Sequence, residues 1–484
     1  MPISIYKRFF LLLVCILTNL FLFAQKFPGK HFNVTDTSYQ CYYEGSLKIS
    51  ANQSLRLGLC FTIIGDTIHV VADSPDQYTF NISVKNFSIK ADTISCQIPT
   101  AMASFKGNFV GDNLVGVFVQ RGRKFKTTLY NMESRVELAD LRPQNPKPPF
   151  PYAEINLNLP EEGSGAMIEG TLVSPKNPKA LLILVSGSGW QNRDEFYLGH
   201  SPFWVLADHL ARAGYATYRY DDRPHSLFAT STTYDFVEDL HRVVHFFIQD
   251  SLWSTLPIGV AGHSEGGYVA LMEASKNSNV DFVVAMAGGA QSATDVLLYQ
   301  VEAILSLDTN ISPTELQTSL KLSSDVYKKL VKCKSTEKFQ KFYLDKVKQI
   351  TKNMSNQDKE RLGYSINNVM TQINTLSTPW FKTFLKIKPQ KYLKQVKVPV
   401  LALNGTKDLQ VCAEDNLQLM KQSLPPHEMH HFAPLEGLNH LFQEADTGHP
   451  DEYGKIQQTL SPVFLSTITL WLDSYIDFYN KNIK

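Results

Sequence analysis

Ser264 lies at the centre of a GHSEG pentapeptide, residues 262–266, which has the pattern Gly-x-Ser-x-Gly. An apolar run, residues 258–261, precedes the pentapeptide, and a helix is predicted from Gly267 onward. A sharp turn between a strand and a helix lifts a serine hydroxyl out of a sheet, and the flanking glycines leave room for such a turn. This context predicts a nucleophilic serine. The alternative is a glycine-rich turn with a solvated serine.

A serine hydroxyl is a poor nucleophile at its usual pKa, so it needs a base and a group that orients the base. In folds that carry a serine on such a turn, the chain order is serine, acid, histidine. Asp408 follows an apolar predicted strand, residues 399–403, and His440 follows a later short strand. We therefore predict Asp408 as the acid and His440 as the base. His263 adjoins the nucleophile, but the turn is expected to point its side chain away.

Attack on a carbonyl also needs donors for the oxyanion. The backbone N–H of Glu265, the residue after the nucleophile, is the first predicted donor. The second should come from the loop after an early strand, which is the VSGSG segment at residues 185–189. Ser188 is the preferred donor there, followed by Gly187 and Gly189. A phosphate loop is the alternative, but the segment lacks the Gly-Lys-Ser/Thr ending.

Residues 427–431 read HEMHH and match the zinc-protease pattern H-E-x-x-H. That pattern binds zinc only on a helix, where residues four apart share a face. Here it follows two prolines and enters an apparent strand, in which His427 and His431 would lie about 13 Å apart. We therefore expect no metal site, and the serine chemistry needs no organic cofactor.

Two further polar segments flank the predicted site. Residues 191–195 (QNRDE) follow the predicted oxyanion loop, and residues 220–223 (YDDR) follow a predicted strand. Both can form buried ion pairs that hold the loops in place. We favour this structural role over direct participation in catalysis.

The pattern of the chain predicts two folded domains. Short alternating runs with regular turns predict a small β-barrel or sandwich over residues 27–138. A proline-rich connector is expected at 139–151. Residues 152–484 alternate apolar runs with helical stretches, which predicts a mostly parallel α/β sheet. A helical stretch at about 291–392 interrupts this alternation and is expected to form a cap over the sheet edge that binds ligands.

The first 24 residues have the layout of a secretory signal peptide. Lys7 and Arg8 precede an apolar run, residues 9–23, and Ala24 offers a small residue at the cleavage point. We expect export to the periplasm or the medium, with an uncleaved anchor as the alternative. No later stretch is apolar enough to span a bilayer. Export permits a disulfide, with Cys41, Cys60 and Cys96 as the candidates.

Composition excludes a nucleic-acid partner. The chain has 484 residues with 47 basic and 46 acidic side chains and a net charge of +1, so it lacks the excess charge that tracks phosphates. Hydrophobic residues make up 43%, which is typical of a globular protein. A small molecule is the expected partner, and no feature of the sequence indicates an oligomeric state.

At residues 186–195 (SGSGWQNRDE), 261–267 (AGHSEGG) and 437–442 (GLNHLF), the chain resembles exported bacterial α/β-hydrolases that carry an N-terminal β-domain. These proteins are described as serine aminopeptidase-like or dienelactone-hydrolase-like. The resemblance implies the α/β-hydrolase fold and supports Asp408 and His440. The chain departs from it in having Ser186 where the family usually has His, and Arg-Pro-His-Ser at 223–226 where the family usually has Arg-Gly-x-Gly.

These observations predict hydrolysis through an acyl-enzyme on Ser264. A carboxylic ester is the first expected substrate and a short peptide the second. The alternative from another class is a ligand-binding protein, whose β-domain holds glycan or lipid while the hydrolase domain is weak or inactive. The third possibility is the metalloprotease that the HEMHH segment suggests.

Overall fold

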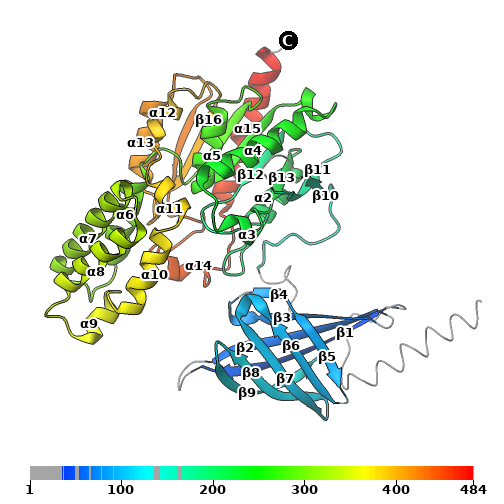
Figure 1. Ribbon diagram of the computed structural model, residues 1–484. Coiled ribbons are helices and arrows are strands. Elements are labelled where there is room, and N and C mark those ends of the chain that lie inside the picture. Colours follow the sequence, from blue (N-terminus) through cyan, green and yellow to red (C-terminus); the bar gives the residue numbers. More distant parts are fainter. Residues whose placement is uncertain are drawn as a thin grey trace, which may run out of the picture. The chain divides into compact units, whose positions relative to one another are not determined.

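The computed structural model (Figure 1) describes residue 35 and residues 38–49, 54–64, 67–77, 79–90, 92–135, 142–160 and 166–482. The chain divides into two compact units, residues 1–141 with 197–199 and residues 142–196 with 200–484. The predicted signal peptide, residues 1–24, lies outside the described residues. Within the described ranges, no helix is long and apolar enough to cross a membrane.

The first unit contains a nine-stranded antiparallel sheet in the order β4-β3-β2-β1-β9-β8-β7-β6-β5. Its interior is apolar, and aromatic rings meet across it. Tyr43 on β1 packs on Phe109 on β7 at 5.9 Å, and Phe61 on β2 packs on Phe87 on β5 at 5.8 Å. Because these strands are not neighbours in the sheet, the sheet is strongly curled and close to a barrel, as predicted. The strands are β1 (Ser38–Lys48), β2 (Ser54–Ile64), β3 (Thr67–Ser74), β4 (Thr79–Ser83), β5 (Lys85–Lys90), β6 (Thr93–Ile98), β7 (Ala103–Val110), β8 (Asn113–Gln120) and β9 (Arg123–Met132).

Two of the cysteines in this unit belong to its interior. Cys41 and Cys96 are both buried, and both are free thiols. The disulfide that export would permit therefore does not form through either of them. Burial raises the pKa of the Cys96 thiol to about 11, which suits a small apolar core residue rather than a reactive one.

The second unit is built on an eight-stranded sheet in the order β10-β11-β13-β12-β14-β15-β16-β17. β11 runs antiparallel to both β10 and β13, and every other neighbouring pair is parallel. This arrangement is the α/β-hydrolase fold, and it confirms the predicted fold class. The strands are β10 (Ala153–Leu159), β11 (Ile168–Ser174), β12 (Leu181–Val185), β13 (Ala216–Tyr220), β14 (Ile258–His263), β15 (Phe282–Met286), β16 (Val400–Gly405) and β17 (His431–Leu435).

Helices bury both faces of this sheet (Figure 1). Leu181 and Ile183 of β12 belong to the core that includes residues of α4 (Thr233–Ile248), α5 (Glu265–Ala274) and α13 (Ala413–Ser423). Leu182 and Leu184 belong to the opposite core, with α2 (Pro202–Arg212) and α15 (Pro462–Asn482). A strand that is apolar on both faces is typical of such a buried parallel sheet, which explains why these runs are continuous in the sequence.

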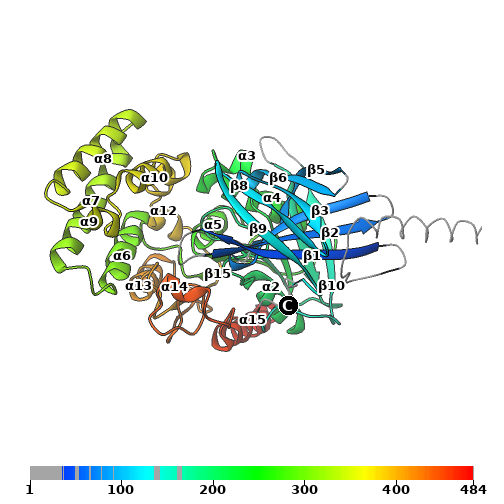
Figure 2. The same ribbon diagram turned by 90° about the horizontal axis from the view of Figure 1, so that it is seen from below.

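A helical insertion separates β15 from β16, as the sequence predicts, and Figures 1 and 2 both show α7 to α10 grouped at one side of the sheet. Serine and threonine caps define several of these helices. Ser312 accepts a bond from the Glu315 amide and completes a capping box, and Thr378 caps the helix that carries Trp380. The helices are α6 (Ala293–Ser306), α7 (Pro313–Lys332), α8 (Thr336–Ile350), α9 (Asn356–Arg361), α10 (Ile366–Leu376), α11 (Pro379–Phe384) and α12 (Pro389–Leu393).

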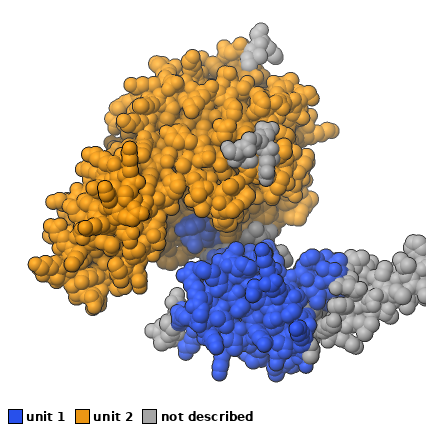
Figure 3. Space-filling view, in the orientation of Figure 1, with its two compact units in different colours: residues 1–141, 197–199 blue, residues 142–196, 200–484 orange. Residues whose placement is uncertain are grey.

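Residues 142–151, part of the predicted connector, belong to the second unit and are coloured with it in Figure 3. Arg142 donates to the carbonyl of Gly454 at 2.8 Å. The Gln144 side chain donates to the carbonyl of Leu460 and accepts from the amides of Thr459 and Leu460, at 2.8, 2.5 and 3.0 Å. The composition of this segment did not predict these contacts.

Candidate active site

Ser264 lies on the tight turn between β14 and α5, with φ 53° and ψ −114°. A positive φ is strained for a residue with a side chain, and such strain is typical of functional turns. The neighbouring glycines are sterically required. A Cβ on Gly262 would lie 2.0 Å from the carbonyl oxygen of Gly266, and one on Gly266 would lie 2.2 Å from that of Val185. The helix begins at Glu265, two residues earlier than predicted.

Asp408 and His440 lie together on the loops that follow β16 and β17. His440 Nδ1 is 2.8 Å from Asp408 Oδ2, and both side chains are buried. The other oxygen of Asp408 accepts from the amides of Gln410 and Val411 at 2.7 and 2.9 Å. These bonds hold the carboxylate so that it can orient one tautomer of the imidazole and stabilise its protonated form.

Backbone contacts fix the two loops against each other. The amide of Thr406 donates to the carbonyl of Leu435, and the amide of Lys407 donates to that of Leu438, both at 2.9 Å. A Cβ on Gly405 would lie 2.1 Å from the Leu438 oxygen. The pairing of Asp408 with His440 therefore depends on a glycine and on main-chain bonds between the two loops.

His263 connects the turn at Ser264 to the Asp408–His440 pair. Its Nε2 lies 3.0 Å from the backbone oxygen of His440, and its Nδ1 lies 2.9 Å from Glu195 Oε1. Burial alone would lower the pKa of His263, but the adjacent Glu195 carboxylate and its hydrogen bond outweigh burial and raise that pKa. The sequence gave no reason to pair these two residues, which are 68 positions apart.

The predicted oxyanion loop lies against the nucleophile, since a Cβ on Gly187 would lie 3.2 Å from the Cβ of Ser264. The Gly187 amide is already engaged, because it donates to Glu195 Oε1 at 2.7 Å. Within the described part of the chain, no group accepts a hydrogen bond from the amide of Ser188 or of Glu265. These two amides are the oxyanion donors that the sequence predicts, and neither is engaged by a described group.

Ion pairs hold the loop that carries these groups. Arg193 makes a bidentate pair with Asp221, and Arg219 pairs with Asp194. Asp222 accepts from the amide of Gln191 at 2.7 Å. The two polar segments thus form an ion pair with each other, of the kind that the sequence predicts, although Arg193 and Asp221 are only half-buried.

The sequence pattern of the family described as serine aminopeptidase, S33, matches residues 177–443, more than half of the 484-residue chain. The chain belongs to this family. The matched region contains Ser264, Asp408 and His440, and it bears out the resemblance drawn from the motifs. No curated protein matches the chain.

Three solved structures are similar in fold. A dienelactone hydrolase from Anabaena variabilis is 15% identical, with a TM-score of 0.38, over 67% of this chain and 98% of that one. The esterase PF2001 from Pyrococcus furiosus is 14% identical, with a TM-score of 0.39, over 71% and 95%. Est1E from Butyrivibrio proteoclasticus is 15% identical, with a TM-score of 0.36, over 68% and 98%.

The chain departs from the predicted family pattern at two places, Ser186 and the Arg-Pro-His-Ser segment at 223–226. Ser186 donates to Asp222 at 3.3 Å. In the Arg-Pro-His-Ser segment, Arg223 pairs with Asp239, and its carbonyl accepts from the Trp190 indole at 3.1 Å. The Trp190 ring stacks on His225 at 4.3 Å. Both departures thus pack around the oxyanion loop rather than around the acid–base pair.

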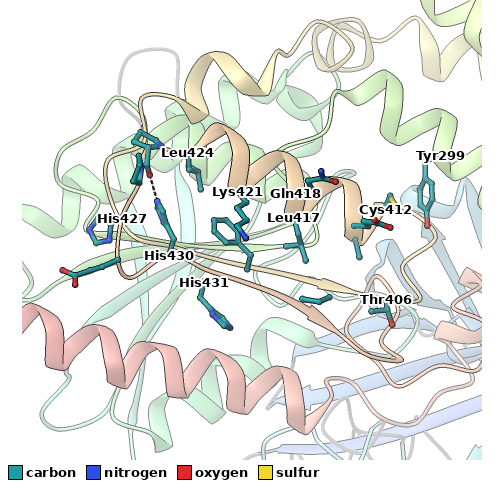
Figure 4. A pocket seen from close by; sticks show the side chains of 17 residues that line it. Tyr299, Thr406, Cys412, Leu417, Gln418, Lys421, Leu424, His427, His430 and His431 are labelled. Carbon is teal, nitrogen blue, oxygen red and sulfur yellow. Dashed lines mark hydrogen bonds between the residues drawn. The ribbon is translucent and has the colours of Figure 1, made fainter.

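The HEMHH segment does not lie on a helix, since His431 begins β17 and His427 lies in the loop before it. Figure 4 shows the two side chains pointing in different directions. His430 uses both ring nitrogens on the backbone, at Val400 and Pro425. Among the described residues, no cluster of His, Cys, Asp and Glu can hold a metal ion.

The hollow drawn in Figure 4 lies along α13 and β17. Tyr299 and Thr406 line one end of it, and Leu424 and His427 line the other. Its lining includes none of Ser264, Asp408 and His440. The candidate catalytic side chains therefore do not line this hollow.

Proposed function

We propose that this protein hydrolyses a carboxylic ester through an acyl-enzyme on Ser264. The observation that carries the proposal is the Asp408–His440 pair at 2.8 Å, on the loops that follow β16 and β17 of the sheet in which β14 ends directly before Ser264. A nucleophile, a base and an orienting acid in this chain order are what acyl transfer requires.

In the proposed reaction, His440 takes the proton of Ser264 as the hydroxyl attacks the carbonyl carbon. Asp408 stabilises the imidazolium that forms. The amides of Ser188 and Glu265 donate to the oxyanion, so the charge is stabilised where it develops. His440 then protonates the leaving alcohol, and a water molecule activated by the same base releases the acid.

A short peptide is the second candidate substrate, because the family that matches residues 177–443 is described as serine aminopeptidase. The same groups would then protonate an amine leaving group. The ligand-binding alternative predicts no turnover, and the complete set of Ser264, Asp408 and His440 argues against it.

The test uses a fluorophosphonate probe, which labels an activated serine, on the wild type and on Ser264→Ala. Hydrolysis of p-nitrophenyl acetate and of aminoacyl p-nitroanilides is measured in parallel. We expect labelling and ester hydrolysis in the wild type, and the loss of both in the variant. A folded wild type that takes no label would overturn the proposal and favour the ligand-binding alternative.

We also propose export, because residues 7–24 have the layout of a signal peptide. N-terminal sequencing of the protein recovered from a bacterial periplasm or medium tests this proposal. A mature chain that begins at Gln25 supports it, and an intact Met1 on a cytoplasmic protein contradicts it.

A further inference from the structure

Glu265, the residue after the nucleophile, has a side chain that joins three parts of the fold. It is the first residue of α5 and is 3% exposed. Its Oε1 accepts from the Trp380 indole N–H of α11 at 2.8 Å and from the Thr233 hydroxyl of α4 at 2.6 Å. The same carboxylate oxygen thus accepts two hydrogen bonds, one from the helical insertion and one from a helix that packs on the sheet.

The environment of this carboxyl group lowers the stability of the fold, which is unexpected for a residue with a purely structural role. Among the residues that the structure describes, its other oxygen, Oε2, is buried without a hydrogen-bond partner, and no basic side chain pairs with the carboxylate. Burial raises the pKa of Glu265 to about 7, against the opposing effect of its two hydrogen bonds. An incompletely paired buried carboxyl group destabilises the fold. Apolar packing would join the same helices without that cost.

Trp380 is held firmly at its own end of the contact. Its ring stacks on Phe384 at 5.3 Å with an interplanar angle of 11°, and it meets Phe381 edge-on at 5.5 Å. Phe384 in turn packs on Tyr268 of α5 at 5.5 Å. The indole N–H therefore has a fixed direction, and a displacement of α11 would act directly on the Glu265 side chain.

We infer that Glu265 is a positioning residue that couples the helical insertion, through Trp380, to the direction of the oxyanion-hole amide. This inference rests on the proposed function. The backbone N–H of Glu265 and its tethered side chain belong to the same residue, at the strained end of a turn. Anchoring the side chain at Trp380 and Thr233 restricts rotation of that residue, and so keeps the N–H aimed at the developing oxyanion.

The test is Trp380→Phe, which keeps an aromatic ring for stacking on Phe384 and removes the N–H with the five-membered ring that carries it. Because a misdirected oxyanion donor acts on the transition state rather than on substrate binding, we expect kcat for p-nitrophenyl acetate to fall about tenfold while KM stays within about twofold. Glu265→Leu, which lacks the acceptor, should lose at least as much, and Glu265→Gln, which keeps an acceptor oxygen, should lose less.

Tyr343→Phe is the matched control. It removes a hydrogen bond between Tyr343 and Gln372 inside the insertion, away from the nucleophile turn. A merely structural role for Trp380 predicts equal effects of the two aromatic substitutions on kcat. The positioning role predicts a loss of kcat in Trp380→Phe alone at a similar melting temperature.

The double variant Trp380→Phe/Glu265→Leu separates the remaining outcomes. If both substitutions break one link, the double variant should be no slower than Glu265→Leu, whereas independent effects multiply and overturn the inference. A labelled, active wild type with an unchanged kcat in Trp380→Phe also overturns it, and leaves the proposed function standing. If Trp380→Phe does not fold, Thr233→Val tests the same carboxylate from α4, and an unaltered kcat there overturns the inference.

Discussion

The nucleophile region and the helical insertion are built on different principles. Around Ser264, glycines stand where a Cβ would collide with backbone, as at Gly262 and Gly405. In the insertion, capped amphipathic helices pack through apolar faces. A Cβ on Gly363 would meet only the side-chain nitrogen of Gln372 among the described atoms within 4 Å, at 3.6 Å. The comparison teaches that the candidate catalytic residues lie on a backbone whose glycines leave no room for a side chain. The helical insertion between β15 and β16 leaves such room at Gly363.

The largest expected effect in this comparison comes from Asp408→Asn. The substitution keeps the shape of the side chain, but it can favour the wrong tautomer of His440, so kcat should fall about 10⁴-fold with little change in stability. Steady-state ester hydrolysis together with thermal unfolding measures both quantities. A loss of less than tenfold would mean that another group orients His440.

A pair of glycine substitutions tests the comparison directly. A Cβ on Gly288 would lie 2.1 Å from the carbonyl oxygen of Ser264, so Gly288→Ala should destabilise the fold by about 3 kcal/mol and lower kcat. Gly363→Ala, in the insertion, meets only a positive φ of 69° and should cost about 1 kcal/mol with kcat unchanged. Urea unfolding and kinetics check both, and equal effects would remove the distinction between the regions.

The smallest expected effects are on the pH dependence of the free energy of unfolding, and this dependence has opposite signs in the two regions. Burial raises the pKa of Asp222 from 3.8 to about 8, so its contribution to stability is complete below pH 4 and is lost as the pH rises to 8. Hydrogen bonds from Ser312, and then from Arg361, lower the pKa of the half-buried Glu315 from 4.5 to about 2. Its contribution is present above pH 4.5 and is lost as the pH falls to 2.

Asp222→Asn should therefore flatten the fall in unfolding free energy between pH 4 and 8, and Glu315→Gln should flatten the fall between pH 4.5 and 2. Urea unfolding of the two variants and the wild type across this range measures the difference. Parallel curves for all three proteins would contradict the assignment of these slopes to the two carboxyl groups.

The sequence predicted the parts of the fold whose signals are local. The strand before Ser264, the order of Ser264, Asp408 and His440, and the helical insertion all follow from short patterns and apolar runs. The contacts of Glu195 with His263 and of Glu265 with Trp380 could not be predicted, because they join residues 68 and 115 positions apart. Their side chains have no distinctive spacing, and only the packing of the sheet and the insertion brings them together.

The contacts of the proline-rich segment at 142–151 determine at which residue a truncated form of the α/β unit can begin. Gln144 accepts from the amides of Thr459 and Leu460, and the next residue, Ser461, donates its amide to the carbonyl of Phe442, two positions after His440. A shortened protein that starts at residue 152 would leave those two amides without their acceptor beside the histidine loop. A separately produced α/β unit should therefore begin at Arg142, because this leading segment completes hydrogen bonds beside the histidine loop.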